Sequence, residues 1–175
     1  MLIFNKKYNL ISKSTEKEVW NRHILDSAQI IKHIDFKKDH ILSDFGSGAG
    51  LPGVILSIAN TNPNFHVKLY EKSPVKRAFL ADIQEITQFY IEKNVYDYKL
   101  IKSDYIVCRA FKKLDLIFDI SREKVKNPHK LIILKGKNAL NDLKKLPKDK
   151  NYRYKTVDSV TDSDSKIIIA TKNGI

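Results

Sequence analysis

Cysteine is almost absent from this sequence, which has one among its 175 residues. A single cysteine excludes an intrachain disulfide framework and any zinc site built from several cysteines, so we expect a reducing compartment and no metal. Apolar runs near the roughly 18 residues of a membrane span are also missing. The first seven residues lack the long apolar region of a signal peptide. We therefore expect a cytoplasmic protein with no membrane partner.

Acidic residues are too few to balance the basic ones: 20 Asp and Glu stand against 32 Lys and Arg, and the formal net charge is +12. Such an excess favours polyanionic partners, either nucleic acid or an anionic membrane surface. A lysine-rich composition without any such partner is the alternative. With 42% hydrophobic residues the chain is long enough to bury one core, and we expect a single domain over residues 1–175.

Glycine is scarce as well, yet four of the six glycines fall between positions 46 and 53. The residues before them, Ile41, Leu42 and Phe45, read as a short buried strand. Pro52 is tolerated in the first turn of a helix and indicates a helix over Gly53–Ala59. A strand, a glycine turn and a helix start form the opening unit of a doubly wound α/β domain, which binds ligands at the carboxyl ends of its strands.

The glycine spacing favours one class of nucleotide ligand over another. A dinucleotide fingerprint, G-x-G-x-x-G, would place its third glycine at position 51, which is Leu51. The order Gly46-x-Gly48-x-Gly50, with Asp44 two residues before it, instead looks like the first motif of Rossmann-type methyltransferases that use S-adenosylmethionine. A purely structural turn is the alternative, because glycines are common in turns.

A carboxylate further along the chain supports an adenosine ligand. The alternating run His66–Tyr70 predicts a second strand that ends at Glu71, about 20 residues after the glycines, where a carboxylate can accept both ribose hydroxyls. The alternative is a solvated carboxylate at a strand end. Because dinucleotide and methyl-donor sites both use such an acid, Glu71 does not choose between them.

Helices and strands alternate through the middle of the chain. Thr15 and Glu18 have the spacing of a capping box and predict a helix of about 20 residues. Pro74 opens a long amphipathic helix that carries apolar residues as far as Tyr90. Residues 98–101 and 105–108 both look like strands, but parallel neighbours need a crossover of about a dozen residues. Either the first is a remnant edge strand or the pair is one irregular segment.

The C-terminal part continues this alternation with a helix over residues 114–125, a strand over 130–134, a short helix over 138–146, and strands over 152–157 and 166–171. The last two strands have no helix between them and predict an antiparallel hairpin around a polar loop. The expected fold class is therefore α/β, a doubly wound and mostly parallel sheet with an antiparallel C-terminal hairpin. Residues 1–36 would form a basic lead and helix, and residues 40–175 a Rossmann-like core.

Several blocks in order resemble one known family: Phe4-Asn5-Lys6-Lys7-Tyr8-Asn9-Leu10, Arg22-His23-Ile24-Leu25-Asp26-Ser27, the glycine turn from Asp44 to Gly53, Glu71-Lys72-Ser73 with Lys76-Arg77 and Phe79-Leu80, Cys108-Arg109-Ala110-Phe111, and Leu134-Lys135-Gly136. Together they are similar to the bacterial small-subunit rRNA guanine-N7 methyltransferases, also called glucose-inhibited division protein B. The His-Ile-Leu-Asp-Ser and Arg-Ala-Phe blocks are far more specific than the glycine turn.

The resemblance implies a Rossmann-like class I methyltransferase that transfers a methyl group from S-adenosylmethionine to N7 of a guanine in 16S rRNA, free or in a small ribosomal subunit precursor. It implies a cofactor-binding shell made of Asp44, Gly46, Ser47, Gly48, Gly50, Leu51, Glu71 and Arg109. Arg109 would also orient the target base, which makes it the expected catalytic residue. Asn9 and His23 match polar positions near the substrate entrance.

The remaining basic candidates are Lys72, Lys76 and Arg77, which we expect to bind rRNA phosphates; a solvated helix face is the alternative. For His23 the alternative is a histidine that caps or packs within its helix. Guanine N7 carries an exposed lone pair, so transfer needs alignment in a water-poor site rather than a general base.

Two other functions stay open. The family contacts adenine through a segment between its third and fourth strands, where this chain has Lys102-Ser103-Asp104. A degenerate, non-catalytic RNA- or ribosome-binding protein of the same fold is therefore the main alternative. A small-molecule methyltransferase is the third, and the net charge of +12 disfavours it. We expect a monomer.

Overall fold

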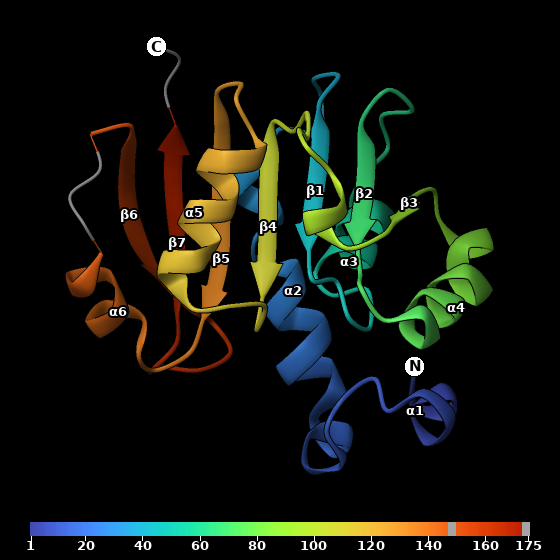
Figure 1. Cartoon of the computed structure of the whole chain (residues 1–175). Coiled ribbons are helices and arrows are strands. Elements are labelled where there is room, and N and C mark those ends of the chain that lie inside the picture. Colours follow the sequence, from blue (N-terminus) through green and yellow to red (C-terminus); the bar gives the residue numbers. More distant parts are fainter. Residues whose placement is uncertain (147–149, 173–175) are drawn as a thin grey trace.

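A seven-stranded sheet forms the centre of the computed structural model, which describes residues 1–146 and 150–172 (Figure 1). Its strands are β1 (Ile41–Phe45), β2 (His66–Tyr70), β3 (Tyr90–Glu92), β4 (Tyr105–Arg109), β5 (His129–Lys135), β6 (Tyr152–Asp158) and β7 (Lys166–Lys172). The order across the sheet is β3-β2-β1-β4-β5-β7-β6. Within residues 1–146 and 150–172, no helix is long and apolar enough to span a membrane.

The first five strands are parallel, and β7 runs antiparallel between β5 and β6. This confirms the predicted mostly parallel sheet with a C-terminal hairpin. β1 has β2 on one side and β4 on the other, so the chain reverses its direction of travel across the sheet at β1. In such sheets the ligand crevice lies beyond the carboxyl ends of the strands at this reversal.

Helical segments cover both faces of the sheet. They are α1 (Leu2–Tyr8), α2 (Asp26–Ala28), α3 (Gly53–Ala59), α4 (Pro74–Ile83), α5 (Leu114–Lys124) and α6 (Ala139–Lys145), with the 3₁₀ turns Lys13–Glu18, Ile31–His33, Gln84–Ile86 and Val95–Asp97 and the π-helical turn Trp20–Leu25. The π-helical turn leads directly into α2, and the two form one helical segment at the carboxyl edge of the sheet (Figure 1).

One core cluster joins the N-terminal segment (residues 1–36), α3 and α4 to one face of the sheet. Val107 of β4 and Ile132 of β5 belong to it together with Leu56 of α3 and Ile30 of the N-terminal segment. All four side chains are fully buried. The N-terminal segment is therefore anchored by apolar burial, which contributes about 1.5–3 kcal/mol for each large side chain.

The second core cluster lies on the opposite face. Ile106 and Ile133 are the strand neighbours of Val107 and Ile132 and point the other way, as the two-residue period of a strand requires. They pack with Ile117 of α5. The short crossover between β3 and β4, residues 93–104, adds its own buried side chains to this face, so it covers the sheet without a regular helix.

The local predictions around the glycine turn and in the C-terminal half are confirmed: α3 spans the predicted residues, and β2, α5, β5, α6, β6 and β7 agree with the prediction to within one or two positions. The predicted capping box at Thr15 is wrong. Thr15 lies inside a 3₁₀ turn that begins at Lys13, and the N-terminal helix consists of short 3₁₀, π and α segments.

Two further predictions are wrong, and they are linked. The helix that begins at Pro74 ends at Ile83, since Phe89 is buried in the core and Tyr90–Glu92 pairs with β2 as an edge strand. Residues 98–101 form no strand, because Ile101 bonds to the end of α5, with its N–H 2.8 Å from the Lys124 carbonyl oxygen. With the third strand placed earlier, the conflict over crossover length disappears.

Candidate functional site

The glycine turn lies at the carboxyl end of β1 and bonds to the end of β2. The backbone N–H groups of Gly46 and Ser47 both donate to the Tyr70 carbonyl oxygen, at 2.9 and 3.1 Å. Gly46 has a φ of 74° and Gly48 a φ of 58°, a left-handed conformation that glycine adopts without steric cost. The turn is therefore held in one shape by both neighbouring strands.

Asp44 lies beneath this turn rather than in an open site. Its carboxylate is fully buried and accepts the Gly53 N–H at 2.9 Å, which ties β1 to the start of α3. Burial raises the pKa of Asp44 to about 7. Ser47 donates its hydroxyl to the Asp44 carbonyl oxygen at 3.0 Å, and the Leu51 side chain is buried in the first core cluster. These residues support the turn from below.

Glu71 holds the turn from the side. Its Oε2 accepts the Gly48 N–H at 2.8 Å and its Oε1 accepts the Ser73 N–H at 2.7 Å. Arg77 fixes the same stretch of backbone, because its guanidinium donates to the carbonyl oxygens of Glu71 and Lys72 at 2.8 and 2.9 Å. Each carboxylate oxygen still has a lone pair for a further donor.

A cavity of about 280 Å³, here called the cradle, opens above the turn. It is lined by the glycine turn, the end of β2 with the residues after it, the first turn of α4, the crossover after β3, and the residues after β4. The lining residues are Gly46, Gly48, Tyr70, Glu71, Lys72, Lys76, Asn94, Val95, Tyr96, Ala110, Phe111 and Lys112.

The wall opposite the glycine turn corrects one sequence-based expectation. Lys102-Ser103-Asp104 does not reach the cradle, because the Asp104 N–H donates to the Ile41 carbonyl oxygen and the Asp104 carboxylate accepts the Ile41 N–H, both at 2.8 Å. This pairing places the segment at the amino ends of the strands. Asn94, Val95 and Tyr96 form the wall instead, so the cradle is closed on that side.

A second cavity of about 490 Å³ adjoins the cradle. Ala110, Phe111 and Lys112 line both cavities, so the segment after β4 lies where the two meet. Ala110 has a φ of 50°, an uncommon conformation for a residue with a side chain and one that clusters at functional sites. The other walls come from the helical segment before β1, from the end of β5, and from the loop between β6 and β7.

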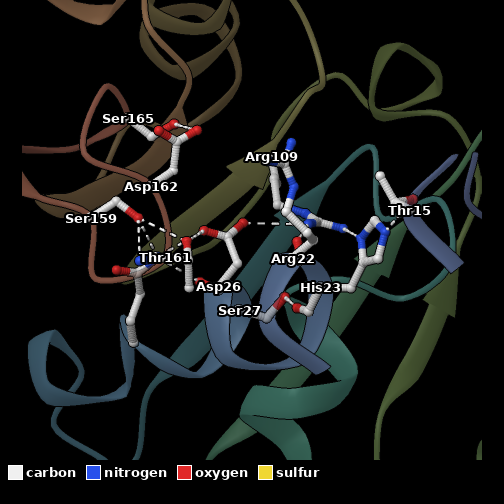
Figure 2. A network of polar contacts seen from close by, with 11 residues as sticks. Thr15, Arg22, His23, Asp26, Ser27, Arg109, Ser159, Thr161, Asp162 and Ser165 are labelled. Carbon is white, nitrogen blue, oxygen red and sulfur yellow. Dashed lines mark hydrogen bonds and ion pairs between the residues drawn. The ribbon is translucent and has the colours of Figure 1, made fainter. Parts of the chain in front are cut away.

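Arg109 faces this second cavity and is bonded to the N-terminal helical segment (Figure 2). Its Nη1 donates to the Arg22 carbonyl oxygen at 2.9 Å and lies 3.3 Å from Asp26 Oδ2. Its Nη2 lies 3.0 Å from His23 Nδ1. Because a guanidinium can only donate, His23 Nδ1 is the acceptor, and His23 Nε2–H donates to the Thr15 hydroxyl at 2.8 Å.

This arrangement fixes the protonation state of His23. The ring is neutral when Nδ1 accepts from Arg109, and burial together with the Arg109 charge lowers the pKa of His23 below its ordinary value of 6.5. Protonation would place two cations against each other. His23 therefore joins β4 to the N-terminal segment as a hydrogen-bond acceptor.

The structure gathers the predicted site residues into three groups. The first group lines the cradle: Gly46, Gly48, Glu71, Lys72 and Lys76. The second supports the turn from outside the cavity: Asp44, Ser47, Gly50, Leu51 and Arg77. The third, Arg109 and His23, lines the second cavity. Asn9 lies apart from both cavities, where it ends α1 with a left-handed φ of 48°.

Sequence reasoning missed the aromatic and crossover residues of the cradle. Phe111 lies two residues after Arg109 in the Arg-Ala-Phe block, and its ring lies against Gly46. Asn94, Val95 and Tyr96 could not be predicted as cavity residues while the third strand was expected at residues 98–101, because they follow the true third strand, Tyr90–Glu92. Asp26 belongs to the His-Ile-Leu-Asp-Ser block, but only the fold places it against Arg109.

Comparisons with known proteins point in one direction. Residues 1–168 match the family described as rRNA small subunit methyltransferase G (GidB). The ribosomal RNA small subunit methyltransferase G of Pelagibacter ubique is 34% identical over 171 residues, which cover 94% of this chain and 80% of that protein. The protein of the same name from Rickettsia bellii is 35% identical over 167 residues, covering 94% and 84%.

Solved structures agree on the fold. A SAM-dependent methyltransferase from Aquifex aeolicus superimposes with a TM-score of 0.64 at 13% identity, covering 91% of this chain and 94% of that one. Aeropyrum pernix fibrillarin, solved with bound S-adenosyl-L-methionine, gives a TM-score of 0.65 at 15% identity, covering 86% and 75%. At these identities the likeness concerns the fold alone, which is that of the class I methyltransferases.

Proposed function

The chain belongs to the rRNA small subunit methyltransferase G family, and from that premise we propose that it transfers a methyl group from S-adenosylmethionine to N7 of a guanine in 16S rRNA. The observation that carries this proposal is the pair of adjoining cavities, which meet at Ala110, Phe111 and Lys112. A transferase of this kind must hold two substrates side by side with a short path between them.

The cradle has the features that an adenosyl ligand needs. A side chain on Gly46 would lie 2.2 Å from the Phe111 ring, so only glycine leaves the turn and the ring in contact. A side chain on Gly48 would meet no atom closer than 3.8 Å, so glycine at this position leaves room for a ligand to approach the backbone. The Glu71 carboxylate would accept the ribose hydroxyls, and Asn94 to Tyr96 would cover the adenine side. Asp44, Ser47, Gly50 and Leu51 would contribute by holding the turn in shape.

S-adenosylmethionine supplies an electrophilic methyl group when it is bound. The protein has no proton to remove, because guanine N7 presents a free lone pair, and its task is to align the base and exclude water. Arg109 and His23 would act on the base side, since both line the second cavity. We assign no general base.

Three lysines at the cradle suit an RNA substrate. Lys72, Lys76 and Lys112 line the cradle, and the net charge of the chain is +12. Contacts to phosphates release counterions, so binding should weaken steeply with salt. The Arg77 guanidinium donates to backbone carbonyl oxygens, so in this proposal Arg77 supports Glu71.

Asn9 would meet RNA only outside the two cavities. We propose that the protein acts as a monomer in the cytoplasm, without a metal.

Calorimetric titration with S-adenosylmethionine, followed by a methyl-transfer assay on 16S rRNA and on small subunits, tests the proposal. We expect saturable binding of one molecule per chain and label in the RNA. Arg109→Ala should keep the fold and lose most of the transfer. A folded chain that binds RNA but not S-adenosylmethionine would overturn the proposal and would favour the non-catalytic RNA-binding protein instead.

A further inference from the structure

Asp26 connects three separate parts of the second cavity (Figure 2). Its Oδ2 lies 3.3 Å from Nη1 of Arg109, at the end of β4. Its Oδ1 accepts the Thr161 hydroxyl at 2.9 Å and the Gln29 side-chain amide at 2.8 Å. The side chain is only 18% exposed, so these contacts are partly shielded from water.

The loop between β6 and β7, residues 159–165, depends on the same helical segment. Gln29 accepts the Val160 N–H at 2.9 Å and donates to the Ser159 hydroxyl at 3.2 Å. Val160 is 62% exposed, so apolar burial does little to hold this part of the loop. Its position against the cavity therefore rests on the polar contacts to Gln29 and Asp26.

We propose that Asp26 is a positioning residue for methyl transfer: it holds Arg109 and the 159–165 loop as two fixed walls of the second cavity, so that the cavity has its shape before a base enters. This inference rests on the proposed function, which assigns the second cavity to the target base. Asp26 does not line the cradle, so its effect should be confined to the RNA side of the reaction.

The chemistry requires a carboxylate at this position. One oxygen faces a permanent cation while the other accepts two donors, and a carboxylate is a pure acceptor with lone pairs for all three. An amide of the same shape would turn an NH₂ group either toward the Arg109 guanidinium or toward the Thr161 hydroxyl and the Gln29 amide. The Thr161 hydroxyl could reverse and accept, but the guanidinium and the Gln29 NH₂ group can only donate. Asp26→Asn therefore loses the contact to Arg109 or the one to Gln29, and in either case the negative charge beside Arg109, without changing the volume of the side chain.

The test compares Asp26→Asn with Asp119→Asn, a control that removes an exposed carboxylate paired with Arg122 on α5. For Asp26→Asn we expect an unchanged affinity for S-adenosylmethionine and a fall of about 10- to 100-fold in kcat/KM for rRNA, as small misplacements of reacting groups produce. Asp119→Asn should match the wild type. Equal losses in cofactor affinity and in kcat/KM would show a general structural role and overturn the proposal.

Thr161→Val provides a second variant that removes one hydroxyl from the loop without touching Arg109. If Asp26 acts partly through the loop, the effects of Asp26→Asn and Thr161→Val on kcat/KM should be less than additive. Fully additive effects would contradict a shared path. Arg109→Lys in place of Arg109→Ala should keep part of the Asp26 contact and part of the rate.

A readout that needs no activity separates this inference from the proposed function. Hydrogen–deuterium exchange of the 159–165 loop should rise in Asp26→Asn and remain unchanged in Asp119→Asn, whether or not methylation is detected. Increased exchange together with an absence of methylation in the wild type would refute the proposed function alone. Unchanged exchange in the loop would refute the positioning role of Asp26.

Discussion

Replacing Gly46 and Gly48 by alanine, one at a time, tests the geometry of the cradle. Both glycines have left-handed backbones, so both substitutions carry the same kind of backbone cost, roughly 1–2 kcal/mol. Only the Gly46 substitution creates a clash, since its new Cβ would lie 2.2 Å from Phe111 Cδ2. At Gly48 the nearest atom outside the turn, Lys76 Nζ, is 3.9 Å away.

The difference between the two variants isolates this clash. Overpacking of this kind costs about 1–3 kcal/mol, and the backbone terms largely cancel in the comparison. Gly46→Ala should therefore lower the free energy of unfolding by about 1–3 kcal/mol more than Gly48→Ala. It should also weaken the binding of S-adenosylmethionine more strongly, because the displaced Phe111 ring lines the cavity.

The measurement is urea unfolding followed by circular dichroism, with a double-mutant cycle that adds Phe111→Ala. Without the ring, the cost of Gly46→Ala should fall to that of Gly48→Ala. Equal costs for Gly46→Ala in the presence and absence of Phe111 would refute the contact between the turn and the segment after β4. Equal costs for the two glycine variants in the wild-type background would do the same.

Three further predictions concern charge. Glu71→Gln should weaken S-adenosylmethionine binding about 10- to 100-fold by calorimetry, the range expected when a charge-assisted hydrogen bond is lost, whereas Glu123→Gln on α5 should not. Burial raises the pKa of Asp44 from 3.8 to about 7, so between these values the folded state keeps a proton that the unfolded chain releases. The free energy of unfolding should therefore fall as pH rises through this interval, and Asp44→Asn should lack that fall. Parallel curves of unfolding free energy against pH for the two proteins would count against the assignment. The lowered pKa of His23 changes stability with pH in the opposite direction, because the stabilising contribution of neutral His23 is lost as pH falls through its folded pKa, below 6.5. An NMR titration should give a His23 pKa below 6.5, and Arg109→Ala should raise it.

The parts of the fold that sequence reasoning placed well are set by neighbouring residues. β1, the glycine turn and α3 follow one another between Ile41 and Ala59, where alternation, positive φ and Pro52 each act locally. The C-terminal hairpin is equally local. Glu71 could be placed at the edge of the cradle because it ends a buried parallel strand, and the carboxyl ends of such strands all lie at the ligand-binding edge of the sheet.

The parts that failed depend on contacts between distant segments. Tyr90–Glu92 is a three-residue edge strand, and its apolar residues fit the period of the preceding helix until the pairing with β2 is known. The partners of Arg109 lie 83 to 87 positions away in the sequence. The resemblance assigned Arg109 to cofactor and base, but its bonds to the N-terminal segment appear only in the folded chain.

The central claim is that two adjoining cavities bring a methyl donor and a guanine together. The most direct test incubates the protein with S-adenosylmethionine carrying an isotopically labelled methyl group and with small ribosomal subunits or 16S rRNA that lack the modification. Nuclease digestion and mass spectrometry then locate the label. The account predicts one labelled 7-methylguanosine, strongly reduced with Arg109→Ala. Label on another atom or another base, or no label from a folded protein that binds S-adenosylmethionine, would contradict it.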